Sequence, residues 1–214
     1  MILYFIDLDG TIEDSKQDMS LCVNLTRKKL SLPELELYFI EKHVNKGMDE
    51  LYRNCFFDYL EKNPTKYSFV KNEYEDCYFK NVCIHTKCYE GIPEAIIALS
   101  QKGKVVVVTN KPEKISRELL KKLRLTNYIT DVMGGDSCAE CKPSPLPLKI
   151  AAEKLNFNRV TDKVFMIGDS LGDIKTALAF DARSVWCSWG YLKELETLKA
   201  DITVNSPLEL INLV

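Results

Sequence analysis

The chain has 214 residues, 46% hydrophobic and 28% charged, which is ordinary for a globular domain with a smaller insert. Its formal net charge of −2, from 29 basic and 31 acidic residues, gives no electrostatic footprint for nucleic acid or an anionic membrane. No apolar run approaches the roughly 20 residues of a membrane span, and no basic region precedes the short apolar N-terminus as in a secretory signal. We expect a soluble, cytoplasmic protein without nucleic-acid or membrane partners, and the sequence carries no signal for its oligomeric state.

Three short apolar runs lack the alternation of a half-exposed strand, which is typical of strands that helices cover on both faces. These runs are residues 2–6, 105–108 and 164–167. Helical patterns lie between and after them, and they are expected to begin near Gly91, Lys111, Ser144 and Ser170. Weaker strands are expected at residues 129–133, 184–187 and 202–204. The alternation of strand and helix predicts a doubly wound parallel α/β sheet.

The stretch from residue 15 to residue 88 has a different character. It is rich in Leu, Lys, Glu and Tyr, and its apolar residues recur at helical spacing, as in Leu51, Cys55 and Tyr59. We interpret it as several helices whose packing core includes aromatic side chains: Tyr38, Phe39, Phe56, Phe57 and Tyr59. The predicted organisation is an α/β domain of residues 1–14 and 89–214, with a helical domain of residues 15–88 inserted after the first strand.

Two aspartates, Asp7 and Asp9, directly follow the first buried strand. Ligands of a doubly wound sheet bind beyond the carboxyl ends of its strands, so both side chains are expected at the functional edge. Gly10 allows the chain to turn tightly there. Like charges at a buried edge are costly unless a cation or a proton lies between them.

Further polar residues follow the other two buried strands. Asp169 and Asp173 add two carboxylates, and a set of oxygen ligands without nearby His or Cys suits Mg²⁺. Thr109 and Asn110 follow the second strand and offer a hydroxyl and an amide to phosphate oxygens. Lys142, at the start of a helix, can balance phosphoryl charge. Together these residues predict a phosphate site with a divalent cation.

The four motifs, in this order, resemble the haloacid dehalogenase superfamily of aspartate-nucleophile phosphotransferases. They are Asp7-Leu8-Asp9-Gly10-Thr11, Thr109-Asn110, Lys142-Pro143 and the run from Gly168 to Asp173. The resemblance covers nearly the whole chain, because the insert looks like the cap domain of that superfamily and the sheet like its Rossmann-like core. The tail, which begins with Trp189-Gly190-Tyr191, is similar to the phosphoglycolate phosphatase-like branch.

The resemblance implies a role for each matching residue. Asp7 would attack phosphorus and become an aspartyl phosphate, while Asp9 would protonate the leaving alcohol and then activate water. Thr109 and the backbone at Asn110 would hold the phosphoryl group, and Lys142 would neutralise its charge.

The resemblance also implies a magnesium site. Asp169 would bind Mg²⁺ beside Asp7 and the main-chain carbonyl of Asp9, with Asp173 behind these ligands. The cap would set specificity for a small phosphorylated metabolite, with 2-phosphoglycolate the first to test. Its expected contact segment is the turn at His43, Asn45, Lys46 and Gly47, chiefly Lys46, although a plain helix–helix turn explains the same residues.

Two other functions stay open. A β-phosphoglucomutase-like phosphotransferase would pass the phosphoryl group to a sugar, although Thr11 favours a phosphatase. A non-catalytic binding protein could keep the fold, but every position of the chemical motifs is intact here.

Some residues are assigned no role in the site. Lys111 and Lys175 are interpreted as surface lysines. Cys138 and Cys141 have a zinc-like or redox-like spacing, which Cys83, His85 and Cys88 could only complete from another part of the fold. We therefore interpret the cysteines as reduced thiols without a metal.

Overall fold

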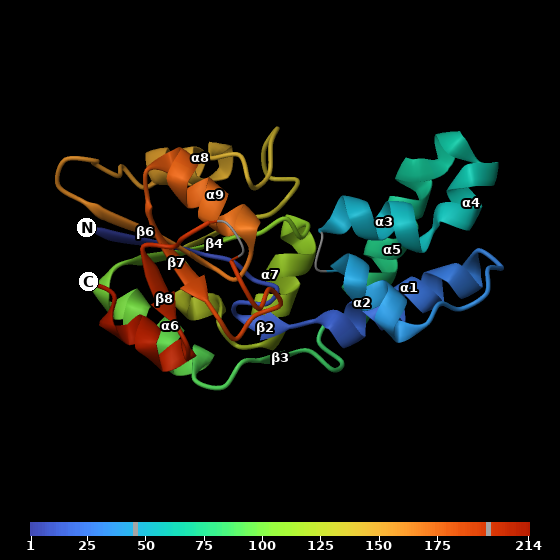
Figure 1. Ribbon diagram of the computed structural model, residues 1–214, viewed down its shortest axis with the longest axis horizontal. Helices are drawn as coiled ribbons and strands as arrows, with labels where there is room; N and C mark the ends of the chain where they lie inside the picture. The colour runs from blue at the N-terminus through green and yellow to red at the C-terminus, as the bar shows by residue number, and fades with distance from the viewer. Residues whose placement is uncertain (45–46, 196–197) are drawn as a thin grey trace. The chain divides into compact units, whose positions relative to one another are not determined.

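The computed structural model describes residues 1–44, 47–195 and 198–214 (Figure 1). The chain divides into two compact units: an α/β unit of Met1–Asp14 with Lys87–Val214, and a helical unit of Ser15–Thr86. Within the described residues, no helix is long and apolar enough to cross a membrane.

Among the described residues, the α/β unit is built on a six-stranded parallel sheet of order β5-β4-β1-β6-β7-β8. Its strands are β1 Ile2–Ile6, β4 Lys104–Val108, β5 Asp131–Met133, β6 Lys163–Gly168, β7 Arg183–Cys187 and β8 Ile202–Val204. Ile6 of β1 is level with Val107 of β4 and Ile167 of β6, so the carboxyl ends of these three strands share one edge. The predicted doubly wound parallel α/β fold is confirmed.

Helices cover both faces of the sheet, with α8 and α9 on one face and α6 on the other (Figure 1). The helices are α6 Ile92–Lys102, α7 Glu113–Lys122, α8 Leu146–Lys154 and α9 Leu171–Phe180, with 3₁₀ helices η2 Thr126–Tyr128 and η3 Pro207–Asn212. Leu3 and Phe5 pack in an apolar cluster with residues of α8 and α9. Tyr4, on the other face, stacks on Phe165 and donates its hydroxyl to the carbonyl of Leu213 (2.9 Å). Burial on both faces explains why β1 is continuously apolar.

The helices begin within two residues of the predicted positions. The start of α9 shows why: the Ser170 hydroxyl accepts from the backbone N–H of Asp173 (3.2 Å), and the Asp173 carboxylate accepts from the backbone N–H of Ser170 (3.0 Å). This reciprocal capping box satisfies two donors that the first turn leaves without helical partners. Of the weaker strands, β8 has the predicted bounds and β5 is shorter than predicted.

The helical unit contains the helices that the spacing predicts for the insert. They are α1 Lys16–Lys29, α2 Leu37–Val44, α3 Met48–Cys55, α4 Phe57–Lys62, the 3₁₀ helix η1 Pro64–Lys66 and α5 Tyr67–Asn81. Asp18 in the first turn of α1 accepts hydrogen bonds from the backbone N–H groups of Ile84, His85 and Thr86 (2.8–3.0 Å). This buried carboxylate therefore ties the beginning of the unit to its end. Beyond the unit, β2 Glu13–Asp14 pairs antiparallel with β3 Lys87–Cys88, so both strands belong to the α/β unit.

The core of the helical unit differs from the predicted aromatic core. Phe56 is buried, but Tyr38, Phe39 and Phe57 are 80%, 40% and 61% exposed, so the prediction was wrong for these three. Helix α2 buries the face that carries Ile40, which leaves Tyr38 on the opposite face. The buried aromatic residues instead include three tyrosines that were not predicted: Tyr52, Tyr74 and Tyr78.

Candidate active site

Three buried carboxylates gather beyond the carboxyl ends of β1 and β6. Asp7 follows β1 and continues the sheet, because its backbone N–H donates to the carbonyl of Ile167 (2.9 Å). Asp169 follows β6, and Asp173 lies in the first turn of α9. Each offers one carboxylate oxygen, and these oxygens lie within 4.8 Å of one another. With Lys142 they form what we call the Asp7 cluster.

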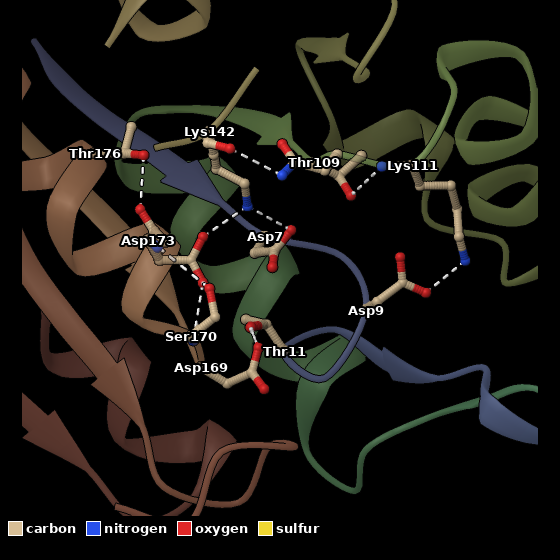
Figure 2. A network of polar contacts seen from close by, with 12 residues as sticks. Asp7, Asp9, Thr11, Thr109, Lys111, Lys142, Asp169, Ser170, Asp173 and Thr176 are labelled. Carbon is tan, nitrogen blue, oxygen red and sulfur yellow. Dashed lines mark hydrogen bonds and ion pairs between the residues drawn. The ribbon is translucent and has the colours of Figure 1, made fainter. Parts of the chain in front are cut away.

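Lys142 carries the positive charge of the Asp7 cluster (Figure 2). Its ammonium lies 2.7 Å from Oδ1 of Asp7 and 2.6 Å from Oδ1 of Asp173, and its side chain is only 4% exposed. The Asn110 amide donates to the main-chain carbonyl of Lys142 (3.0 Å) and so anchors the loop that carries the lysine. The expected phosphate-binding residue Asn110 therefore also supports the position of Lys142.

Asp169 is fixed by neighbours on both sides. Its Oδ1 accepts from the hydroxyl of Thr11 (3.1 Å), and its Oδ2 accepts from the backbone N–H of Tyr191 (2.6 Å). Gly10, with φ of +81°, lies so close that a Cβ atom there would collide with the Asp169 carboxylate. A glycine is required at this position for both its conformation and its size.

Burial and the repulsion by neighbouring carboxylates make Asp7 and Asp169 hard to ionise. Burial, followed by the charge of Asp173, raises the pKa of Asp7 to about 8, against the opposing effect of Lys142. The same two causes raise the pKa of Asp169 to about 6. Burial by itself would lower the pKa of Lys142, but Asp173 and Asp7 raise it above its ordinary value. One ammonium does not balance three buried carboxylates, so the cluster fits a hard divalent cation such as Mg²⁺.

Asp9 belongs to a second charged group, although it lies only two residues from Asp7. Its Oδ1 lies 2.5 Å from the ammonium of Lys111, and Figure 2 shows its carboxylate directed to that lysine. The Lys111 ammonium is also 3.6 Å from Oε1 of Glu13. Burial raises the pKa of Glu13 well above its usual range, more than Lys111 lowers it. Asp9, Lys111 and Glu13 form what we call the Asp9 cluster.

The interpretation of Lys111 as a surface residue was wrong. Its side chain and that of Glu13 are fully buried, whereas Lys175 is exposed as expected. One signal in the sequence could have found Lys111: it follows a buried strand at the same edge as Thr109, two residues earlier. Glu13 carries no comparable signal.

The other predicted site residues are placed as follows. Thr109 is buried at the end of β4, where its backbone N–H donates to Met133 (2.9 Å) and its hydroxyl accepts from the N–H of Lys111 (3.2 Å). His43 lies in α2 rather than in a turn and packs buried against Phe39. Asn45 and Lys46 lie outside the described residues.

The cysteines form no metal site among the residues that the structure describes. The thiol of Cys138 donates to the carbonyl of Glu140 (3.0 Å), and Cys141 is exposed. In residues 1–44, 47–195 and 198–214, the carboxylates of the Asp7 cluster are the one group of His, Cys, Asp or Glu side chains with ligand spacing.

The chain is similar to known proteins in sequence and in fold. The family model of haloacid dehalogenase-like hydrolases matches residues 4–187. A phosphoglycolate phosphatase of Aquifex aeolicus is 33% identical, over 100% of this chain and 97% of its own. A phosphoglycolate phosphatase of Nitrosococcus oceani is 31% identical, over 99% of this chain and 96% of its own. A crystal structure described as a predicted phosphoglycolate phosphatase from Haemophilus somnus has a TM-score of 0.85 at 24% identity, covering 98% of this chain and 96% of that one.

The matching family model and the parallel sheet define the class of protein, a hydrolytic enzyme with a Rossmann-like core. The chain belongs to the haloacid dehalogenase-like hydrolase family, as its motifs predict. Within that family it is an enzyme of the phosphatase kind.

Proposed function

We propose that the chain is a magnesium-dependent phosphatase that hydrolyses a small phosphate monoester through an aspartyl phosphate on Asp7. The observation that carries this proposal is the pairing of Asp7 with Lys142 beside two further carboxylates at the carboxyl edge of the sheet. The two relatives named phosphoglycolate phosphatase, aligned over nearly the full chain, make 2-phosphoglycolate the first substrate to test.

The first chemical step forms the phosphoenzyme. An Asp7 carboxylate oxygen attacks phosphorus, the bond from phosphorus to the ester oxygen breaks, and the leaving oxygen takes a proton from the carboxyl group of Asp9. Lys142, 2.7 Å from Asp7, favours the ionised nucleophile and neutralises phosphoryl charge. The Thr109 hydroxyl and the backbone N–H of Asn110 hold the phosphoryl oxygens.

The second step returns the enzyme. Asp9, now a carboxylate, takes a proton from water as that water attacks phosphorus, which releases inorganic phosphate and restores the Asp7 carboxylate. When bound, Mg²⁺ would supply positive charge against the phosphoryl group. Asp7, Asp169 and the main-chain carbonyl of Asp9 would hold it. Asp173 supports this site from its bond to Lys142.

The helical unit is proposed to recognise the organic part of the substrate, as the cap domain of the family would. The contact by Lys46 stays a prediction from the sequence, as does a cytoplasmic location. If a Lys46→Ala variant turns over a panel of anionic esters like the wild type, the predicted contact by Lys46 is wrong.

The proposal is tested with purified protein, p-nitrophenyl phosphate and a panel of small phosphate esters, with and without Mg²⁺. Phosphate release should need both the metal and Asp7, so Asp7→Asn serves as the matched inactive variant. The best ester of the panel names the substrate class. Sugar-phosphate isomerisation that needs Asp7, without phosphate release, would replace the phosphatase by a phosphoglucomutase-like enzyme. If the protein shows neither activity, the remaining alternative is a non-catalytic binding protein.

A further inference from the structure

The Asp9 cluster is built by a short turn of the chain. The backbone N–H of Gly10 donates to the carbonyl of Glu13 (2.9 Å), and Asp9 forms an isolated β-bridge with Glu13. This turn returns Glu13 to the side of Asp9, so both carboxylates reach one ammonium, at 2.5 and 3.6 Å. The two carboxylates of the cluster are therefore neighbours in the sequence, whereas its lysine comes from the distant segment that follows β4.

Lys111 is held firmly at the end of β4. Its backbone N–H donates to the hydroxyl of Thr109 (3.2 Å), and its carbonyl accepts from the backbone N–H of Gly135 (2.9 Å). Its side chain is fully buried, where an ammonium is costly unless carboxylates lie close to it. A buried lysine on an anchored backbone gives the Asp9 carboxylate one defined direction.

The orientation of the Asp9 carboxylate matters because the rate of proton transfer depends strongly on the distance and angle between donor and acceptor. A general acid must lie within hydrogen-bond reach of the atom that it protonates. The Asp9 carboxylate is 20% exposed, so its proposed proton acceptor can approach it from solvent, whereas Lys111 and Glu13 are closed to solvent. Lys111 contacts the Asp9 carboxylate directly, so we expect its effect on the reaction to pass through Asp9.

The geometry points to Lys111 as a positioning residue that orients the Asp9 carboxylate for proton transfer, with Glu13 keeping the Lys111 ammonium in place. This inference rests on the proposed function, because it takes Asp9 as the acid and base of a phosphatase.

The test compares leaving groups. A p-nitrophenolate leaves as a stable anion and needs little help from an acid, whereas an alkoxide needs a proton as the bond breaks. We would measure kcat/KM, which reports the steps up to release of the alcohol, for p-nitrophenyl phosphate and for the best alkyl ester of the panel. The proteins are the wild type, Lys111→Met, Glu13→Gln and Asp9→Asn, with exposed Lys175→Met as the matched lysine control.

We expect Lys111→Met to lower kcat/KM for the alkyl ester about tenfold more than for the aryl ester, within the range that general acid catalysis supplies. Glu13→Gln should change the same ratio in the same direction by about threefold, Asp9→Asn should change it most, and Lys175→Met should leave it at the wild-type value. The ratio of two substrates in one preparation does not depend on the folded fraction. If Lys111→Met gives no soluble protein, the ratio for Glu13→Gln decides the question.

Equal losses on both esters, or no loss on either, would overturn the positioning role of Lys111. That failure is separate from failure of the proposed function. A wild type that hydrolyses neither ester, or an Asp9→Asn variant with an unchanged ratio, removes the phosphatase mechanism itself. If the ratio of kcat/KM for the two esters changes in Asp9→Asn but not in Lys111→Met or Glu13→Gln, only the positioning role of Lys111 is wrong.

Discussion

The Asp7 cluster and the Asp9 cluster start two residues apart and meet the cost of buried charge in different ways. In the Asp7 cluster, three carboxylates surround one ammonium, and the pKa values of Asp7 and Asp169 rise. In the Asp9 cluster, a buried lysine contacts Asp9, and the second acid, Glu13, is driven toward its neutral form. The excess of negative charge, and with it the demand for a cation, is therefore confined to the Asp7 cluster.

Replacing the nucleophile should have the largest effect. Asp7→Asn removes the attacking oxygen but keeps the shape of the side chain, so kcat should fall on the order of 10⁴-fold or more. Steady-state phosphate release measures this. The variant should unfold at a higher temperature than the metal-free wild type, because one of three repelling carboxylates is gone. A variant that retains a tenth of the activity would show that Asp7 is not the nucleophile.

The response to Mg²⁺ should distinguish the Asp7 cluster from the Asp9 cluster. Chelation should abolish phosphate release, and saturating Mg²⁺ should stabilise the fold by roughly 2.7 kcal/mol at a hundred times its Kd. Thermal unfolding with and without Mg²⁺ measures this difference. Asp169→Asn should lose the stabilisation, while Lys111→Met should keep it. Loss of the Mg²⁺ effect in Lys111→Met would contradict the separation of the clusters.

A smaller effect is expected at Gly10, in the turn that connects the clusters. Gly10→Ala places a Cβ against the Asp169 carboxylate at φ of +81°. The strain should cost about 1–3 kcal/mol of folding free energy. Weaker Mg²⁺ binding should accompany it, because Asp169 must shift. Chemical denaturation and a Mg²⁺ titration check both effects, and Gly172→Ala, a glycine with an ordinary φ in α9, is the control. Wild-type stability in Gly10→Ala would show that the turn is not constrained.

The raised pKa values of Asp7 and Asp169 also predict that stability depends on pH. Because the pKa values of Asp7 and Asp169 are raised to about 8 and about 6, the folded state holds protons that the unfolded chain releases near its ordinary pKa of 3.8. The metal-free protein should therefore lose stability as pH rises from about 4 through 8, by at most about 1.4 kcal/mol per pH unit for each group. Denaturant titrations with chelator measure this slope.

Mg²⁺ should flatten the slope in the upper part of that pH window, because a bound cation favours the ionised carboxylates. The variant Asp7→Asn should remove the part of the slope above pH 6. A slope that persists unchanged in Asp7→Asn would assign it to other groups.

The sequence by itself determined the sheet and the members of the Asp7 cluster. A parallel strand that is covered on both faces must be apolar throughout, so β1, β4 and β6 can be recognised from composition. Parallel strands end at a common edge, so residues just beyond them, such as Asp7 and Asp169, must converge. Ser170 and Asp173 likewise indicate the start of α9, because a capping box involves only residues that are close in the sequence.

Only the tertiary structure decided the partners of Asp9 and the exposed face of α2. Lys111 lies 102 residues from Asp9, and its charge is buried because β4 pairs directly with β1. A lysine beyond a strand end reads the same in sequence whether it faces solvent or a carboxylate, and strand order is not a local property. The exposure of Tyr38 has the same origin, because the face of a short helix that is buried depends on which helices pack against it.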